Sequence, residues 1–123
     1  MPLSLSATHA INGFVRASLI NSRYGLDLLT DGEIDGINID LETAEMAQSY
    51  CDRVRARNRL GVTSGPTIEM IFRDNDHYHL VRAVEGVPDV LIHVVIDRHT
   101  GNLVHARNVV ASVTQDVAKA LLH

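Results

Sequence analysis

Alternating and continuous apolar runs along the chain predict five strands. Residues 11–21 are rich in β-branched and apolar side chains without helical spacing, and residues 26–30 return after a turn. Residues 67–73 alternate between apolar and polar side chains, residues 77–84 follow a tight turn, and residues 90–97 are almost continuously apolar. Alternation is typical of strands, and a continuous apolar run indicates a central strand covered on both faces. The short turns favour antiparallel pairing.

Helical patterns occur in two long segments and one short one. Residues 40–60 place acidic residues near the start and arginines near the end, with Asp40 as the expected N-cap and Gly61 as the expected end. After Asn102, a second expected cap, apolar residues recur every three or four positions. Residues 4–10 are long enough for one or two helical turns. The predicted order is α-β-β-α-β-β-β-α, an α/β domain of the α+β type in which helices sandwich a five-stranded antiparallel sheet.

Composition narrows the class of protein. The chain has 123 residues, 46% hydrophobic and 21% charged, which predicts one globular domain over residues 1–123. A single cysteine excludes a disulfide framework and is consistent with a reducing compartment. The net charge of −4 and the 4% aromatic content argue against nucleic acid as a partner. The chain has no long apolar run and no secretory signal at its start, so we expect no membrane insertion and a cytoplasmic location.

The order and spacing of several segments carry a family resemblance. The chain resembles the Roadblock/dynein light chain family in the form found in bacterial small-GTPase regulators. The segments that carry the resemblance are residues 68–72, 78–82, 90–98 and 102–107, and more loosely residues 11–15 and 24–26. The first helix, within residues 1–10, is shorter than is usual for the family.

The resemblance implies a profilin-like fold and a function in binding. It implies a homodimer in which the long helix and the third strand of each copy pair, so that the sheet extends to ten strands. It also implies that the dimer binds a Ras-like small GTPase or serves as a scaffold for a signalling complex. The sequence has no glycine-rich nucleotide loop, so we expect that the chain does not hydrolyse nucleotide itself. It also has no recognisable nucleophile motif, and we expect no enzymatic activity and no cofactor. The chain would act by holding one conformation of its partner.

The 40–60 helix has two stripes that are predicted to do different things. An aliphatic stripe is expected to face the sheet: Leu41, Ala44, Ala47, Cys51 and Val54. A second stripe on another side is expected to bind a partner: Met46, Tyr50, Arg53 and Arg57. Methionine, tyrosine and arginine are enriched in protein interfaces. The alternative is one wide buried face flanked by solvated arginines.

The strand at residues 67–73 is a second candidate interface. Ile71 shares a face with Glu69 and Arg73. If this strand lies at the edge of the sheet, its backbone is a template for pairing. A symmetric second copy could cover it, and the alternative is an edge exposed to solvent.

An acidic stretch offers a competing hypothesis, calcium binding. Asp31, Glu33, Asp35 and Glu42 have nearly the spacing of a calcium loop, with a glycine at the turn position. Glu33 is longer than the usual aspartate or asparagine, no clear helix precedes the stretch, and no second copy is present. A solvated turn before a capped helix is the favoured interpretation.

Three histidines could meet on one face of the sheet. His77 and His79 alternate on one strand, and His93 joins them if Val84 pairs with Val90. Three imidazoles can bind zinc, but neither cysteine nor glutamate is at hand as a fourth ligand. Histidines bonded to their neighbours in the sheet are the favoured interpretation.

Two further features could carry a ligand or chemistry. The polar cluster at residues 97–99 follows a strand and is expected to bond turn amides, because no nucleophile motif accompanies it. Small residues on the last helix leave room for a pocket between that helix and the sheet: Ala106, Ala111 and Ala118. A small-ligand-sensing domain of similar architecture is therefore the alternative function.

Overall fold

The elements of the structure follow the predicted order. The computed structural model describes residues 3–32, 36–62 and 68–122. The elements are a 3₁₀ helix η1 (Ser6–Ala10), β1 (Phe14–Asn21), β2 (Leu26–Gly32), α1 (Ile39–Arg59), β3 (Glu69–Arg73), β4 (His77–Ala83), β5 (Val90–Asp97) and α2 (Leu103–Leu121).

The strands form one five-stranded sheet in the order β2-β1-β5-β4-β3. Each neighbouring pair is antiparallel, which confirms the prediction from the short turns for β1–β2, β3–β4 and β4–β5 and extends it to β1–β5. Strand β5 lies at the centre and is buried from Val90 to Ile96, which confirms its prediction as the central strand. Strands β2 and β3 are the two edges of the sheet.

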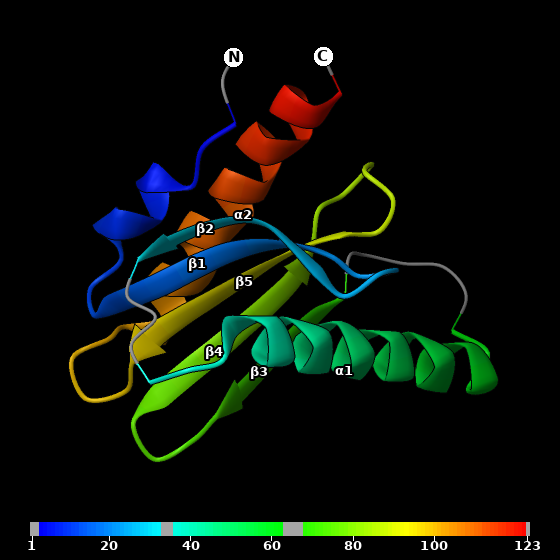
Figure 1. The fold of residues 1–123 in the computed structure, drawn as a ribbon, viewed down its shortest axis with the longest axis horizontal. Coiled ribbons are helices and arrows are strands. Elements are labelled where there is room, and N and C mark those ends of the chain that lie inside the picture. The colour runs from blue at the N-terminus through cyan, green and yellow to red at the C-terminus, as the bar shows by residue number, and fades with distance from the viewer. Residues whose placement is uncertain (1–2, 33–35, 63–67, 123) are drawn as a thin grey trace.

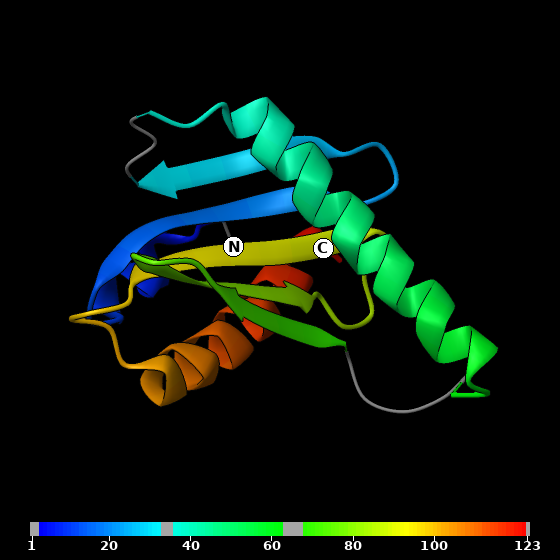
Figure 2. The ribbon, with the colours of Figure 1, turned by 90° about the horizontal axis from the view of Figure 1, so that it is seen from below.

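Helices cover both faces of the sheet, and each face has its own hydrophobic cluster. Helix α1 crosses one face obliquely, and α2 and η1 lie on the other (Figures 1 and 2). Because side chains alternate along a strand, Leu19 points into the cluster with α2, and its neighbour Ile20 points toward α1. The α2-side cluster is the larger one and includes Ile92, Val94 and Val110. The α1-side cluster of buried residues is small, with Ile20, Ala47, Val81 and Leu91.

Asparagine side chains cap both long helices. Helix α2 begins after Asn102, which accepts a hydrogen bond from the His105 N–H at 3.0 Å, as predicted. Helix α1 is capped by Asn38, whose Oδ1 accepts from the Leu41 N–H at 3.1 Å. The prediction of Asp40 as the cap is therefore wrong by two residues. Asp40 lies in the first turn, where its charge still complements the helix dipole.

The short first element fills a corner of the larger cluster. Leu5 and Ile11 on either side of η1 are buried, together with Thr8 inside it. The Thr8 hydroxyl donates to the Leu5 carbonyl at 2.6 Å, so the turn satisfies its own buried polar group. A single 3₁₀ turn is sufficient here because it packs beside α2.

The predicted assignment of the α1 faces is correct at Ala47, which is buried in the α1-side cluster, and wrong at the start of the helix. Leu41 is 59% exposed and Ala44 is exposed, although both belong to the stripe that was expected to face the sheet. Met46 and Tyr50, which were expected on another side, pack against the α1-side cluster and are half-buried. The helix is rich in charged residues and has only a weak apolar face, so the aliphatic stripe did not identify the buried side.

Candidate functional site

Strand β3 leaves one side of the sheet open. It is the last strand in the sheet order, and among the described residues it pairs with β4 alone. Ile71 is 40% exposed and Arg73 is exposed. Met70 and Phe72 point to the opposite face, where they pack against the α1-side cluster. The sequence predicted an interface at this strand only if the strand lies at the edge of the sheet, and β3 does lie there.

A groove of about 550 Å³ runs between α1 and β3. Two of the predicted partner-binding residues of α1, Met46 and Arg53, line it together with Met70 and Phe72 of β3. The remaining lining residues are Glu45, Ser49, Asp52 and Ala56. The fold thus brings part of the helix stripe and the edge strand into one continuous surface.

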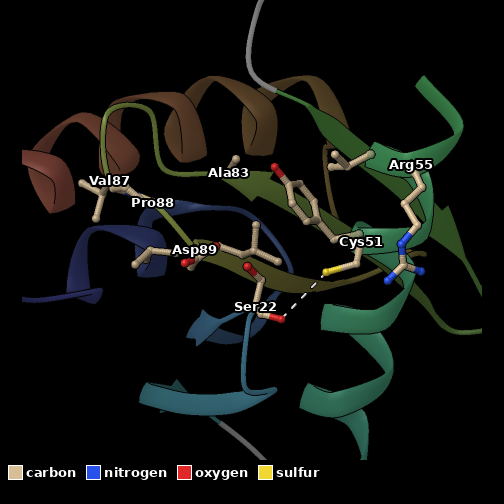
Figure 3. A pocket seen from close by; sticks show the side chains of 11 residues that line it. Ser22, Cys51, Arg55, Ala83, Val87, Pro88 and Asp89 are labelled. Atoms are coloured by element: carbon tan, nitrogen blue, oxygen red, sulfur yellow. Dashed lines mark hydrogen bonds between the residues drawn. The ribbon is translucent and has the colours of Figure 1, made fainter. Parts of the chain in front are cut away.

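Tyr50 lines a second cleft, of about 470 Å³, on the other side of α1. Figure 3 shows this cleft from close by. Cys51 also faces this cleft, with its thiol 3.9 Å from the Ser22 carbonyl oxygen, so it is half-buried and not the core residue that the sequence indicated. Burial raises the pKa of the Tyr50 hydroxyl above its ordinary value, Cys51 adds to this shift, and Arg57 opposes it. Of the predicted partner-binding residues of α1, Met46 and Arg53 therefore line the groove beside β3, whereas Tyr50 lines the second cleft.

A buried polar network beneath the start of α1 was not predicted from the sequence. Arg16 on β1 is only 1% exposed and forms an ion pair with Glu42 of α1. The Glu42 carboxylate lies 3.8 Å from Nδ1 of His93 on β5. His93 Nε2 is 3.0 Å from His79 Nδ1, and His79 Nε2 is 3.2 Å from the Asp74 carboxylate. The network joins the first turn of α1 to three strands and to the β3–β4 turn.

Burial and its neighbours determine the protonation state of His93. Burial lowers the pKa of His93 to about 3, and the adjacent His79 and Arg16 act in the same direction. His93 is therefore a neutral imidazole at physiological pH. Arg16 keeps its Nε and Nη1 atoms without a hydrogen-bond partner among the described residues. The signal in the sequence was an arginine among the mostly apolar residues of β1.

Asp74 closes the β3–β4 turn at the outer end of the network. Desolvation works to raise the pKa of its carboxyl, but hydrogen bonds from the backbone N–H groups of Asp76 and His77, and the nearby His79, lower it to about 2. These two N–H groups lie 2.9 Å and 2.7 Å from Asp74 Oδ1. The ionised carboxylate therefore holds the turn next to the edge strand.

The metal hypotheses find little support in the geometry. Val84 pairs with Val90 as the zinc hypothesis required, yet His79 and His93 bond to each other. Over residues 3–32, 36–62 and 68–122, no group of three potential ligands is placed to hold a metal ion. Of the calcium candidates, Asp31 pairs with His9 at 2.9 Å and Glu42 pairs with Arg16. Glu33 and Asp35 lie outside the described residues, and the segment before them is strand β2 rather than a helix.

The remaining candidates have structural roles or stay untested. Asp97 accepts from the N–H groups of His99 and Thr100 at 2.7 Å and 3.0 Å, so it bonds turn amides as expected. A groove of about 340 Å³ between α2 and the end of β4 is lined in part by Ala111 and Ala118. Ala106, the third residue of the ligand-sensing hypothesis, is buried in the core. Within the described part of the chain, neither long helix has the apolar length needed to cross a bilayer.

Comparison with known proteins identifies the fold. No family model matches the sequence, and no curated protein sequence matches it. A Roadblock/LC7 domain from Streptomyces avermitilis is similar in structure, with a TM-score of 0.79 and 15% identity over 98% of this chain and 96% of that one. The gliding protein MglB from Thermus thermophilus has a TM-score of 0.77 and 17% identity over 94% of this chain and 84% of that one. An MglB described as having a tetrameric arrangement has a TM-score of 0.80 and 16% identity, covering 94% and 83%. The resemblance found in the sequence is confirmed for the fold: the chain has the fold of Roadblock/LC7 domain proteins.

Proposed function

We propose that this chain is a non-enzymatic interaction module that forms a homodimer through α1 and β3. The observation that carries the proposal is the open edge of β3 beside the groove that contains Met46, Arg53 and Phe72. An edge strand with an exposed isoleucine at its centre favours association unless something covers it. A second copy related by a two-fold axis covers the edge strand and the groove at the same time.

The partner of the dimer is a Ras-like small GTPase or a signalling complex that contains one, in the cytoplasm. This part of the proposal is supported by the likeness to Roadblock/LC7 and MglB proteins. The sequence lacks a glycine-rich nucleotide loop, so the chain acts on the conformation of its partner. Such an effect requires that one nucleotide state of the GTPase binds more tightly than the other.

Light scattering on the purified chain and two variants tests the homodimer. Ile71→Arg places a charge at the centre of the exposed edge and is expected to give a folded monomer. Val104→Arg is the matched control, because Val104 is 70% exposed on α2. This variant should have the same molar mass in solution as the wild-type dimer. Tyr50→Asp is a poorer test, since Tyr50 packs against the sheet and its loss also weakens the fold. A monomeric wild-type chain, or an unchanged dimer in Ile71→Arg, contradicts the proposed interface.

A pull-down against Ras-like GTPases tests the partner. The wild-type chain should retain such a GTPase in one nucleotide state, loaded with either GDP or a non-hydrolysable GTP analogue, and release it in the other. Recovery of no GTPase in either state counts against this half of the proposal and leaves the homodimer standing.

A further inference from the structure

The second cleft, the one that Tyr50 lines, has the size and the walls of a small-molecule site. Its volume of about 470 Å³ lies within the range of about 300–1,000 Å³ that is usual for such sites. It shares no lining residue with the groove beside β3, so its occupation does not depend on the proposed homodimer. Much of its wall is apolar and comes from α1, the end of β4, the β4–β5 turn and β5: Val54, Ala83, Val87, Pro88, Val90 and Leu91.

Ser22 places a hydroxyl without a partner in this cleft. The residue is only 8% exposed, and its N–H donates to the Asp89 carbonyl at 2.8 Å. Its own carbonyl oxygen lies 3.9 Å from the Cys51 thiol, whereas its hydroxyl bonds to none of the described residues. Figure 3 shows the Ser22 side chain pointing into the cleft between Asp89 and Cys51. A buried hydroxyl that is left unpaired costs free energy, so a ligand that bonds to it recovers a hydrogen bond.

Asp89 adds a negative charge at the mouth of the cleft. Its side chain is exposed and forms no ion pair with another residue in the described ranges. Burial raises the pKa of Tyr50, and Asp89 contributes in the same direction, so the carboxylate lies close to the Tyr50 hydroxyl. Asp89 has a φ of +62°, and the bond from the Ser22 N–H to its carbonyl holds this backbone in place. The carboxylate is therefore attached to a fixed point of the rim.

The positive charge at the cleft is already engaged. Arg55 lies on the opposite side of the cleft from Asp89 in Figure 3, and its Nη1 pairs with the Asp52 carboxylate at 3.1 Å. An anionic ligand would have to share Arg55 with Asp52 and would also lie near the unpaired carboxylate of Asp89. A cationic ligand meets an unpaired carboxylate and a free hydroxyl.

We propose that this cleft binds small organic amines. The apolar body of the amine packs against the wall formed by α1 and the β4–β5 turn, and its ammonium group donates to the Asp89 carboxylate and to the Ser22 hydroxyl. An ammonium group has several N–H donors, so one group can serve both acceptors. The aromatic face of Tyr50 adds a favourable contact for a cation at the same end of the cleft.

Three probes of nearly one shape test the class of ligand: 2-phenylethylamine, 2-phenylethanol and phenylacetate, which are cationic, neutral and anionic. In NMR titrations of the full ¹⁵N-labelled chain, the amine should bind saturably and shift the backbone N–H signals of Ser22 and Leu91. It should bind about three- to fivefold more tightly than the alcohol, which is the gain expected from one exposed ion pair. Phenylacetate should bind most weakly. Saturating amine should also slow the reaction of Cys51, the native cysteine, with an aromatic disulfide reagent.

Substitutions at the two polar groups separate their roles. Asp89→Asn keeps a side chain that tolerates a positive φ, and it should remove the preference for the amine while leaving the affinity for the alcohol unchanged. Ser22→Ala should weaken the binding of both. Asp116→Asn is the matched control, because Asp116 is exposed on α2 and its loss should change none of the affinities.

Two kinds of result would overturn the proposal. Equal affinity for amine and alcohol, an amine preference that survives in Asp89→Asn, or tightest binding of phenylacetate would refute the class of ligand. A lack of saturable binding by all three probes, or signal shifts confined to the groove beside β3, would refute the site itself.

Discussion

The buried His93 gives the fold a defined sensitivity to acid. Its pKa is lowered from 6.5 to about 3, first by burial and then by His79 and Arg16. Below pH 6.5 the unfolded chain therefore takes up a proton at residue 93 that the folded chain excludes, and stability present above 6.5 is lost as the pH falls toward 3. Each pH unit below 6.5 costs about 1.4 kcal/mol, so His93 alone should remove roughly 2 kcal/mol of stability by about pH 5.

Urea denaturation at constant protein concentration measures this loss. The free energy of unfolding of the wild-type chain should fall more steeply between about pH 7.5 and pH 5 than that of His93→Gln, which has no titrating group at this position. Over this pH range the wild-type chain should lose roughly 2 kcal/mol more of its free energy of unfolding than His93→Gln loses. His105→Gln is the matched control, because His105 is exposed on α2 and its removal should leave the slope unchanged. Parallel curves for wild type and His93→Gln would refute the assignment of a neutral, buried His93.

Two further changes test other parts of the α1 side. Glu42→Gln leaves the buried Arg16 without its countercharge and should cost about 3–5 kcal/mol in urea denaturation, whereas Asp40→Asn in the same helical turn should cost less than about 1 kcal/mol. Gly32→Ala should be strongly destabilising by thermal melting, because Gly32 has a φ of +116° and an added Cβ would lie 2.3 Å from the Val15 carbonyl oxygen. Gly86→Ala, with a φ of +80° and open space around it, should cost only about 1–2 kcal/mol, and equal losses in the two glycine variants would contradict the clash.

The α2 cap and the central strand, which depend on a few neighbouring residues, could be predicted from the sequence. The rotation of α1 about its own axis could not. Asn102 and the run from Val90 to Ile96 carry their signals within a few residues, so the α2 cap and the central strand were predicted correctly. The rotation of α1 depends on how the helix crosses the sheet, which its polar sequence does not specify. Leu41 was therefore expected to be buried and is exposed, whereas Met46 packs inward.

The buried network eluded prediction for a related reason. Arg16, Glu42, His79 and His93 lie on four different elements, so their contacts depend on the register of the β1–β5 and β4–β5 pairs. The predicted pairing of Val84 with Val90 placed His93 diagonal to His79, but nothing in the sequence indicated that Arg16 and Glu42 would join them. The sequence shows which residues of one strand share a face, but it does not show which residues of different strands and helices come into contact.

The two faces of the sheet are stabilised differently, and this difference bears on why the chain would associate. The α2 side has a large aliphatic cluster, whereas the α1 side combines a small apolar cluster with a buried ionic network. Buried ion pairs contribute little net stability because desolvation offsets their attraction. The α1 side therefore owes less of its stability to apolar burial within one copy than the α2 side does. Phe72 stacks on His79 with 5.4 Å between ring centroids and also lines the groove beside β3, so apolar surface buried there by a second copy would adjoin the network and shield it further from water.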